Sequence, residues 1–177
     1  MAKRVLLTGV SGSGKSTVTA ALAAQGFRAV DLDTPEWSHW VDVPDVDGPH
    51  GPPAAPGRDW AWREDRVERL LTEHTGGVPF VSGCAENMRR FLHRFDLRVL
   101  LFPPRTMIRA RLAQREPGSY GARAEERLRV MRHLETVEPL LRRSADLELD
   151  TDRPVEAVVE RLLRAVEALD AAPVTTL

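Results

Sequence analysis

The first residues that could do chemistry lie at positions 9–16, where glycines and small residues precede a lysine. The stretch reads Gly-Val-Ser-Gly-Ser-Gly-Lys-Ser and has the spacing G-x-x-x-x-G-K-[ST]. Such glycines let backbone N–H groups surround phosphate oxygens, while Lys15 reaches the β- and γ-phosphates and Ser16 is a Mg²⁺ ligand. The pattern predicts binding of ATP and Mg²⁺. The expected nucleotide-binding residues here are Ser11, Gly12, Ser13, Gly14, Lys15, Ser16 and Thr17.

A glycine-rich turn that binds nothing is the alternative interpretation of this stretch. The apolar run 4–8 before it is typical of a buried strand, and residues 16–25 after it have helical spacing. A strand, a loop and a helix in this order are the context that phosphate binding requires. The motif predicts nucleotide binding, but GTPases, ATPases and kinases all use it, so it does not identify the reaction.

Two carboxylates, Asp31 and Asp33, close the second expected strand. Because side chains alternate along a strand, both project to one side, at the sheet edge where the glycine-rich loop also lies. One carboxylate there could bind a water molecule of the Mg²⁺ coordination shell, and the other could accept the proton of an attacking hydroxyl. We assign Asp31 to the metal and Asp33 to the acceptor. A solvated strand end or a helix cap is the alternative.

Several arginines could contact anionic groups. Arg63 and Arg66 lie one helical turn apart and could clamp an anionic substrate, although a solvated helix face explains them as well. Arg115 precedes a Pro- and Gly-containing loop, and is the best candidate for contact with the transferred phosphate when that loop closes.

The elements that must position these residues alternate between strands and helices. Strands are expected at 4–8, 29–31, 78–81, 97–102 and 147–149, and helices at 16–25, 60–72, 86–95, 106–115, 124–143 and 155–169. This order predicts a single α/β domain over 1–177, a three-layer sandwich with a mostly parallel five-stranded sheet and helices on both faces.

Two segments lack periodicity. Residues 42–59 form a Pro/Gly-rich insertion in the expected acceptor region, which predicts a loop that is either disordered or a functional lid. Residues 116–123 are expected to form a smaller lid loop over bound ATP.

Composition excludes several kinds of partner and location. The formal net charge of -1 offers no basic field for nucleic acid or anionic membrane, and the single cysteine, Cys84, excludes an intramolecular disulfide. No run of about 18 apolar residues occurs, so a cytoplasmic protein is expected. The oligomeric state is not indicated.

Several short stretches together resemble the shikimate kinase and gluconate kinase group of P-loop small-molecule kinases, which have a nucleoside monophosphate kinase-like fold. Residues 9–16 look like the gluconate kinase P-loop, and Asp31-Leu32-Asp33 is similar to the D-x-D motif that follows strand two in both families. The resemblance implies that Asp31 serves the metal shell and Asp33 contacts the substrate hydroxyl.

The resemblance continues along most of the chain. Trp62-Arg63 resembles the F-R pair whose arginine binds a substrate carboxylate, and Arg111 to Arg115 looks like the R-L-x-x-R pattern entering the lid. Residues 149–154 are similar to an adenine-side loop, which implies nucleotide contact by Arg153. Two features differ from the group. This chain lacks the G-G-G motif that shikimate kinases have on strand three, and it contains the insertion at 42–59.

The function indicated by the residues and the resemblance is ATP- and Mg²⁺-dependent transfer of the γ-phosphate to a hydroxyl of a small, anionic metabolite. Two alternatives stay open. One is a nucleoside monophosphate kinase, which needs a base-recognition pocket. The other is a nucleotide-dependent switch or ATPase, which would not need Asp33.

Overall fold

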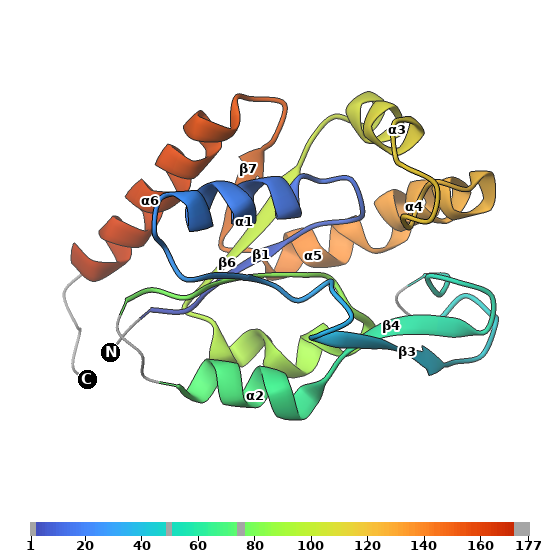
Figure 1. The fold of residues 1–177 in the computed structure, drawn as a ribbon, viewed down its shortest axis with the longest axis horizontal. Helices are drawn as coiled ribbons and strands as arrows, with labels where there is room; N and C mark the ends of the chain where they lie inside the picture. Colours follow the sequence, from blue (N-terminus) through green and yellow to red (C-terminus); the bar gives the residue numbers. More distant parts are fainter. Residues whose placement is uncertain (1–2, 49–50, 74–76, 172–177) are drawn as a thin grey trace.

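A five-stranded parallel sheet forms the centre of the computed structural model, which describes residues 3–48, 51–73 and 77–171 (Figure 1). Its strand order is β2-β5-β1-β6-β7, and every neighbouring pair is parallel. The strands are β1 (Val5–Thr8), β2 (Ala29–Asp31), β5 (Phe80–Ser82), β6 (Leu97–Phe102) and β7 (Leu147–Asp150). This confirms the predicted α/β sandwich.

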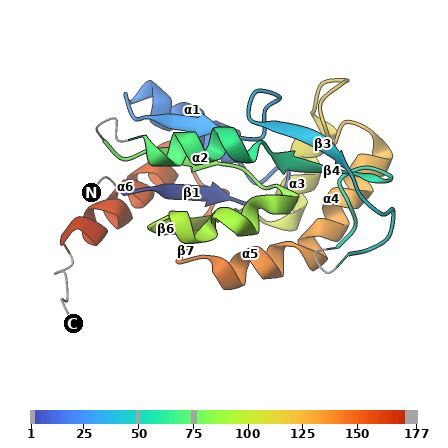
Figure 2. The same cartoon turned by 90° about the horizontal axis from the view of Figure 1, so that it is seen from below.

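Side-chain alternation along the strands separates two apolar layers. In β1, Val5 and Leu7 belong to the cluster packed by α1 (Lys15–Ala24) and α6 (Val155–Ala171), while Leu6 belongs to the cluster on the opposite face. That second layer is completed by α2 (Glu64–Thr72), the 3₁₀ helix η1 (Glu86–Arg94) and α5 (Glu138–Ser144), as Figures 1 and 2 show. A strand buried on both faces needs a continuous apolar run, which residues 5–7 of β1 and 99–102 of β6 provide.

A β-hairpin that the sequence pattern did not predict flanks the insertion. It pairs β3 (Ser38–Asp42) with β4 (Arg58–Trp62) in antiparallel register. The helix expected at 60–72 was therefore placed too early, because residues 60–62 pair across the hairpin and α2 begins only at Glu64. Trp62 is fully buried and Trp60 lies opposite Trp40, so aromatic packing on a pleated surface decides the conformation here.

The long helix expected at 124–143 is two helices in the structure. The first is α4 (Ala124–Thr136). Val137 separates it from α5, which has Pro139 in its first turn. Proline lacks an N–H group and its ring clashes with the preceding turn, so it is tolerated at the start of a helix and not in its interior. The remaining helix, α3 (Arg105–Ala113), lies close to its predicted position.

Between the hairpin strands, residues 43–48 and 51–57, which we call the strap, lie against α4. Both views place the hairpin at the same end of the molecule as α3 and α4 (Figures 1 and 2). The polar contacts pair Pro52 O with His133 Nε2 at 2.8 Å, Pro53 O with Arg129 Nη1 at 3.0 Å, Ala54 O with Tyr120 Oη at 3.0 Å, and Asp47 with Arg132. The described part of the insertion is thus packed against α4; residues 49–50 lie outside the described residues.

No helix in the described part of the chain combines the length and the apolar character that crossing a bilayer requires.

Gly51 tests the packing of the strap on α4. Its φ of +92° is left-handed, and a Cβ there would lie 2.2 Å from Thr136 Oγ1. Gly77 has a similar φ of +95°, but a Cβ there would meet nothing within 4 Å. We expect alanine at either site to lower the free energy of unfolding by about 1–2 kcal/mol through backbone strain. Gly51→Ala should cost about 1–3 kcal/mol more, through overpacking.

Urea denaturation of the two variants measures this difference. Equal losses for Gly51→Ala and Gly77→Ala would show that the strap is not held against Thr136 in solution.

Candidate functional site

The glycine-rich loop connects β1 to α1 at the carboxyl edge of the sheet, and its glycines are sterically required. A Cβ at Gly9 would lie 2.5 Å from both Leu101 O and Ser13 Oγ, and Gly14 has a φ of +101°. The loop therefore keeps its backbone close to α3 and β6 while its last residues begin α1. Ser13 Oγ is buried without a hydrogen-bond partner among the described residues.

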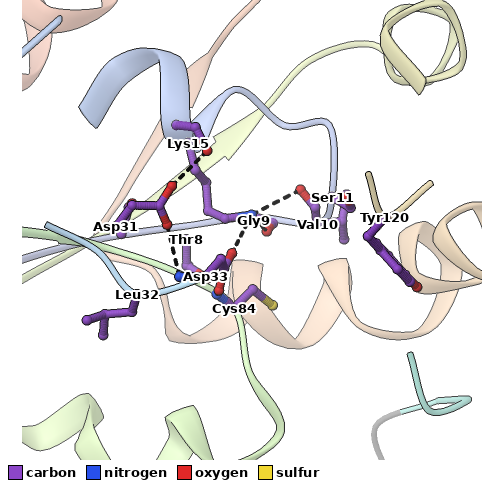
Figure 3. Close-up of polar contacts among 12 residues, drawn as sticks. Thr8, Gly9, Val10, Ser11, Lys15, Asp31, Leu32, Asp33, Cys84 and Tyr120 are labelled. Atoms are coloured by element: carbon purple, nitrogen blue, oxygen red, sulfur yellow. Dashed lines mark hydrogen bonds and ion pairs between the residues drawn. The ribbon is translucent and has the colours of Figure 1, made fainter. Parts of the chain in front are cut away.

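Lys15 points back along the loop from the first turn of α1 (Figure 3). Its Nζ donates to Gly9 O at 2.8 Å and to Val10 O at 3.4 Å, and lies 3.4 Å from Asp33 Oδ2. The residue is only 8% exposed. The ammonium is thus held between the loop and the carboxylate that follows β2, where it can interact with groups bound to either.

Ser16 and Asp31, the two predicted metal-binding residues, are in direct contact. Ser16 Oγ donates to Asp31 Oδ2 at 2.8 Å. The backbone N–H of Asp33 donates to Asp31 Oδ1 at 2.9 Å (Figure 3). A hydroxyl and a carboxylate suit Mg²⁺, which binds through few protein oxygens and completes its shell with water and nucleotide phosphates. The two residues fit such an ion.

Asp33 lies at the centre of the site. Besides Lys15, its carboxylate accepts a hydrogen bond from the backbone N–H of Cys84 at 3.0 Å, after β5. Burial raises the pKa of Asp33 above its ordinary value, and the charge of Lys15 and the Cys84 N–H offset this only in part. About 26% of its side chain is still exposed, so a ligand in the cleft can reach it.

Arg111 and Arg115 project from α3 toward the glycine-rich loop. Arg111 donates to Gly12 O at 3.0 Å and to Thr151 O at 2.8 Å. Arg115 donates to Ser11 Oγ at 3.0 Å and to Tyr120 O in the predicted lid loop. Two of the three predicted nucleotide-binding arginines therefore touch the loop. Arg153 is exposed and lines the same cleft.

Most of these residues, although not Asp31, line a cleft of about 1360 Å³ that also reaches the hairpin and the strap. One end contains the glycine-rich loop and the three arginines. The other end, which we call the acceptor half, is walled by the hairpin, the strap, the loop at 116–123, α4, η1 and α5. Its lining residues include Trp40, Asp59, Trp60, Glu86, Met88, Arg89, Tyr120, His133, Val137 and Leu140.

Arg63 and Arg66, the predicted anion clamp, do not line this cleft. Arg63 Nε donates to Pro35 O at 3.4 Å, and Arg66 Nη1 donates to Glu36 O. Both side chains hold the turn that follows Asp33, because backbone carbonyls there need donors. The structure thus separates them from the other predicted site residues.

Thr151, Asp59 and Tyr120 were not predicted as site residues. Thr151 Oγ1 donates to Ser13 O at 2.7 Å and accepts a hydrogen bond from Arg111 Nη1 at 3.2 Å. These bonds connect the end of β7 to the glycine-rich loop. A polar residue directly after a predicted parallel strand was a signal for Thr151. Asp59 lines the cleft as part of hairpin strand β4, and the Pro/Gly-rich composition of 42–59 gave no signal for that strand.

The fold is shared with solved small-molecule kinases. A sugar kinase from Janibacter sp. HTCC2649 is 23% identical, with a TM-score of 0.56 over 96% of this chain and 98% of its own. Shikimate kinase from Acinetobacter baumannii, solved with shikimate, is 16% identical, with a TM-score of 0.61 over 95% and 94%. A gluconokinase from Sinorhizobium meliloti 1021 is 22% identical, with a TM-score of 0.58 over 94% and 93%.

No protein-family model and no curated protein sequence matches the chain. At these identities the structural likeness shows a P-loop kinase-like fold over nearly the whole length and does not identify a substrate. It confirms the fold that the P-loop and D-x-D resemblance implied.

The raised pKa of Asp33 predicts a stability change with a definite sign. A carboxyl whose pKa is higher in the folded protein binds more protons there, so stability falls as pH rises from the ordinary Asp value through the raised one. Asp33→Asn removes this titration. We expect the variant to gain stability relative to the natural protein across that window and to keep the gain at neutral pH.

Urea unfolding of both proteins between about pH 4 and pH 8 measures the effect. Asp31→Asn is the matched control. A stability difference for Asp33→Asn that shrinks as pH rises would contradict this description of Asp33.

Proposed function

We propose that the protein is an ATP- and Mg²⁺-dependent phosphotransferase that moves the γ-phosphoryl group to a hydroxyl of a small molecule. The observation that carries the proposal is the position of Asp33. Its carboxylate lies 3.4 Å from the P-loop lysine and also borders a cleft that extends well beyond the nucleotide end. A nucleotide switch without an acceptor needs neither feature.

The residues around the glycine-rich loop would bind the nucleotide. Backbone N–H groups at the start of α1 and the Lys15 ammonium favour phosphate oxygens, and Ser16 with Asp31 would hold the metal ion. The bound ion supplies charge neutralisation for the phosphates. The loop's fixed glycines and the unpartnered Ser13 hydroxyl fit such a ligand.

Lys15 and Arg115 would stabilise the charge that develops during transfer. Arg115 is half-buried between Ser11 and the loop at 116–123, so closure of that loop would bring its guanidinium over the phosphates. Arg111 and Arg153 would orient the rest of the nucleotide. Removal of water by the closed loop strengthens each of these charge interactions.

Asp33 would orient the acceptor hydroxyl and accept its proton as the oxygen attacks phosphorus. Its raised pKa makes the ionised carboxylate a better proton acceptor than an ordinary aspartate, and the neighbouring Lys15 ammonium favours that ionised form. Arg63 and Arg66, which the structure turns toward Pro35 and Glu36, would position the Asp33 turn and would not bind the acceptor.

Lys15→Ala tests the nucleotide end. Loss of the ammonium removes a positive charge from the phosphate site, so we expect weaker ATP binding and a loss of turnover. Isothermal titration with a non-hydrolysable ATP analogue and Mg²⁺ measures the first, and ADP release the second. Lys3→Ala, which changes the chain's other lysine outside the site, is the control. Unchanged affinity in Lys15→Ala would exclude the nucleotide assignment.

Asp33→Asn tests the acceptor end. The amide cannot take the hydroxyl proton, so kcat for ADP release in the presence of an acceptor should fall by about 10²-fold or more. The affinity for ATP should change only slightly. In the natural protein, kcat should rise with pH through the raised pKa of Asp33, and this limb should vanish in Asp33→Asn. An unchanged pH profile would exclude Asp33 as the base.

A further inference from the structure

The two oxygens of the Asp33 carboxylate have different surroundings. Oδ1 accepts a hydrogen bond from the backbone N–H of Cys84 at 3.0 Å, while Oδ2 lies 3.4 Å from the Lys15 ammonium (Figure 3). The Oδ1 side of the carboxylate therefore faces the backbone that follows β5, and the Oδ2 side faces the expected phosphate site. A carboxylate held in this way can use one oxygen for positioning and the other for chemistry.

Trp62, the last residue of β4, approaches the Oδ1 side of the same carboxylate. A Cβ at Gly83 would lie 3.0 Å from both Nε1 and Cζ2 of Trp62 and 3.1 Å from Asp33 Oδ1. The indole edge that carries the N–H group and the carboxylate oxygen thus approach one and the same point beside the Gly83 backbone. Because glycine has no side chain, residue 83 leaves the path between the two groups open.

The indole N–H of Trp62 has no hydrogen-bond partner among the described residues, although the side chain is fully buried. A buried donor without an acceptor is costly, and native proteins pair nearly all such groups. A charged oxygen accepts stronger hydrogen bonds than a neutral one. Asp33 Oδ1, across the open position at Gly83, is therefore the acceptor that best suits this N–H group.

The position of Trp62 is fixed by buried residues of η1. The backbone N–H of Trp62 donates to Asn87 Oδ1 at 2.8 Å, and Asn87 Nδ2 donates to Trp62 O at 2.9 Å. The indole packs on Phe91 with ring centroids 5.7 Å apart. Asn87 and Phe91 are themselves buried. The protein core thus holds the indole in place before any ligand binds, which is what a group that orients a reacting side chain requires.

We propose that the Trp62 indole N–H and the Cys84 backbone N–H together hold Asp33 Oδ1, and that Oδ2 is the oxygen that accepts the hydroxyl proton. Trp62 does not line the cleft, so it is a positioning residue that acts through Asp33. This inference rests on the proposed function. As the acceptor oxygen bonds to the γ-phosphorus, its proton passes to Oδ2, and the bond from that phosphorus to the bridging oxygen of ADP breaks.

NMR measures the Trp62–Asp33 contact without turnover. The chain has four tryptophans, so the indole N–H region of a ¹H–¹⁵N spectrum is simple, and Trp62→Phe identifies the Trp62 signal by its loss. We expect that signal to lie downfield, because a carboxylate deshields the proton that it accepts. It should move upfield in Asp33→Ala. Asp42→Ala, which removes another carboxylate near the same hairpin but outside the cleft, should leave it in place.

Kinetics measures what the contact does. The readout is ADP release from Mg-ATP with D-glucitol, D-glucose and D-gluconate as probe acceptors. Trp62→Phe keeps a ring against Phe91 but loses the N–H, so kcat should fall about tenfold or more while KM values change little. In the Asp33→Asn protein the same substitution should change kcat only slightly, because both act through one group. Trp37→Phe, the same change in the same apolar cluster, should leave kcat unchanged.

Gly83→Ala is a second, independent variant that also serves if Trp62→Phe does not fold. Its methyl group would lie between the indole edge and Oδ1, so it should move the Trp62 signal upfield and lower kcat.

A Trp62 signal that is unchanged in Asp33→Ala would overturn the proposal. So would an equal loss of kcat on Trp62→Phe in the natural and Asp33→Asn proteins, which would indicate a purely structural role. If the NMR contact is present but none of the probes stimulates ADP release, the Trp62–Asp33 contact stands and the result counts against phosphotransfer.

Discussion

The contact between Lys15 and Asp33 is the interaction on which the rest of the site depends. It brings an ammonium from the first turn of α1 within 3.4 Å of a carboxylate that follows β2. In the sheet, β5 lies between β2 and β1, the strand that leads into α1. Burial disfavours the charge on Asp33, and Lys15 supplies the compensation. In the proposed reaction the phosphates would lie on the lysine side of this pair and the acceptor on the aspartate side.

The insertion gives this otherwise common fold a distinct acceptor half. Its two ends pair as a hairpin that contributes Trp40 and Trp60, and the strap between them is fastened to α4 and to Tyr120. This wall, which packs on η1 through Trp62, is therefore built by a segment outside the five-stranded sheet. Since Tyr120 belongs to the loop that Arg115 also contacts, strap, lid loop and P-loop form one connected set of hydrogen bonds.

The sequence predicted those parts of the molecule that local rules control. The glycine-rich loop, the two aspartates after β2 and the alternation of strands and helices follow from backbone geometry and from the period of the apolar residues. The hairpin did not, because Trp60 and Trp62 also fit a helical pattern and only pairing with residues 38–42 fixes them as strand. Arg63 is similar: its spacing suits an anion clamp, but the tertiary fold turns it toward Pro35.

The central claim is that the cleft transfers phosphate to a hydroxyl, with Asp33 accepting the proton. The most direct measurement is ³¹P NMR of Mg-ATP with a panel of small polyhydroxy compounds, for the natural protein and for Asp33→Asn. The account predicts a new phosphomonoester signal that grows with the ADP signals in the natural protein and is strongly slowed in the variant. Formation of inorganic phosphate alone, or ester formation at equal rates in both proteins, would contradict it.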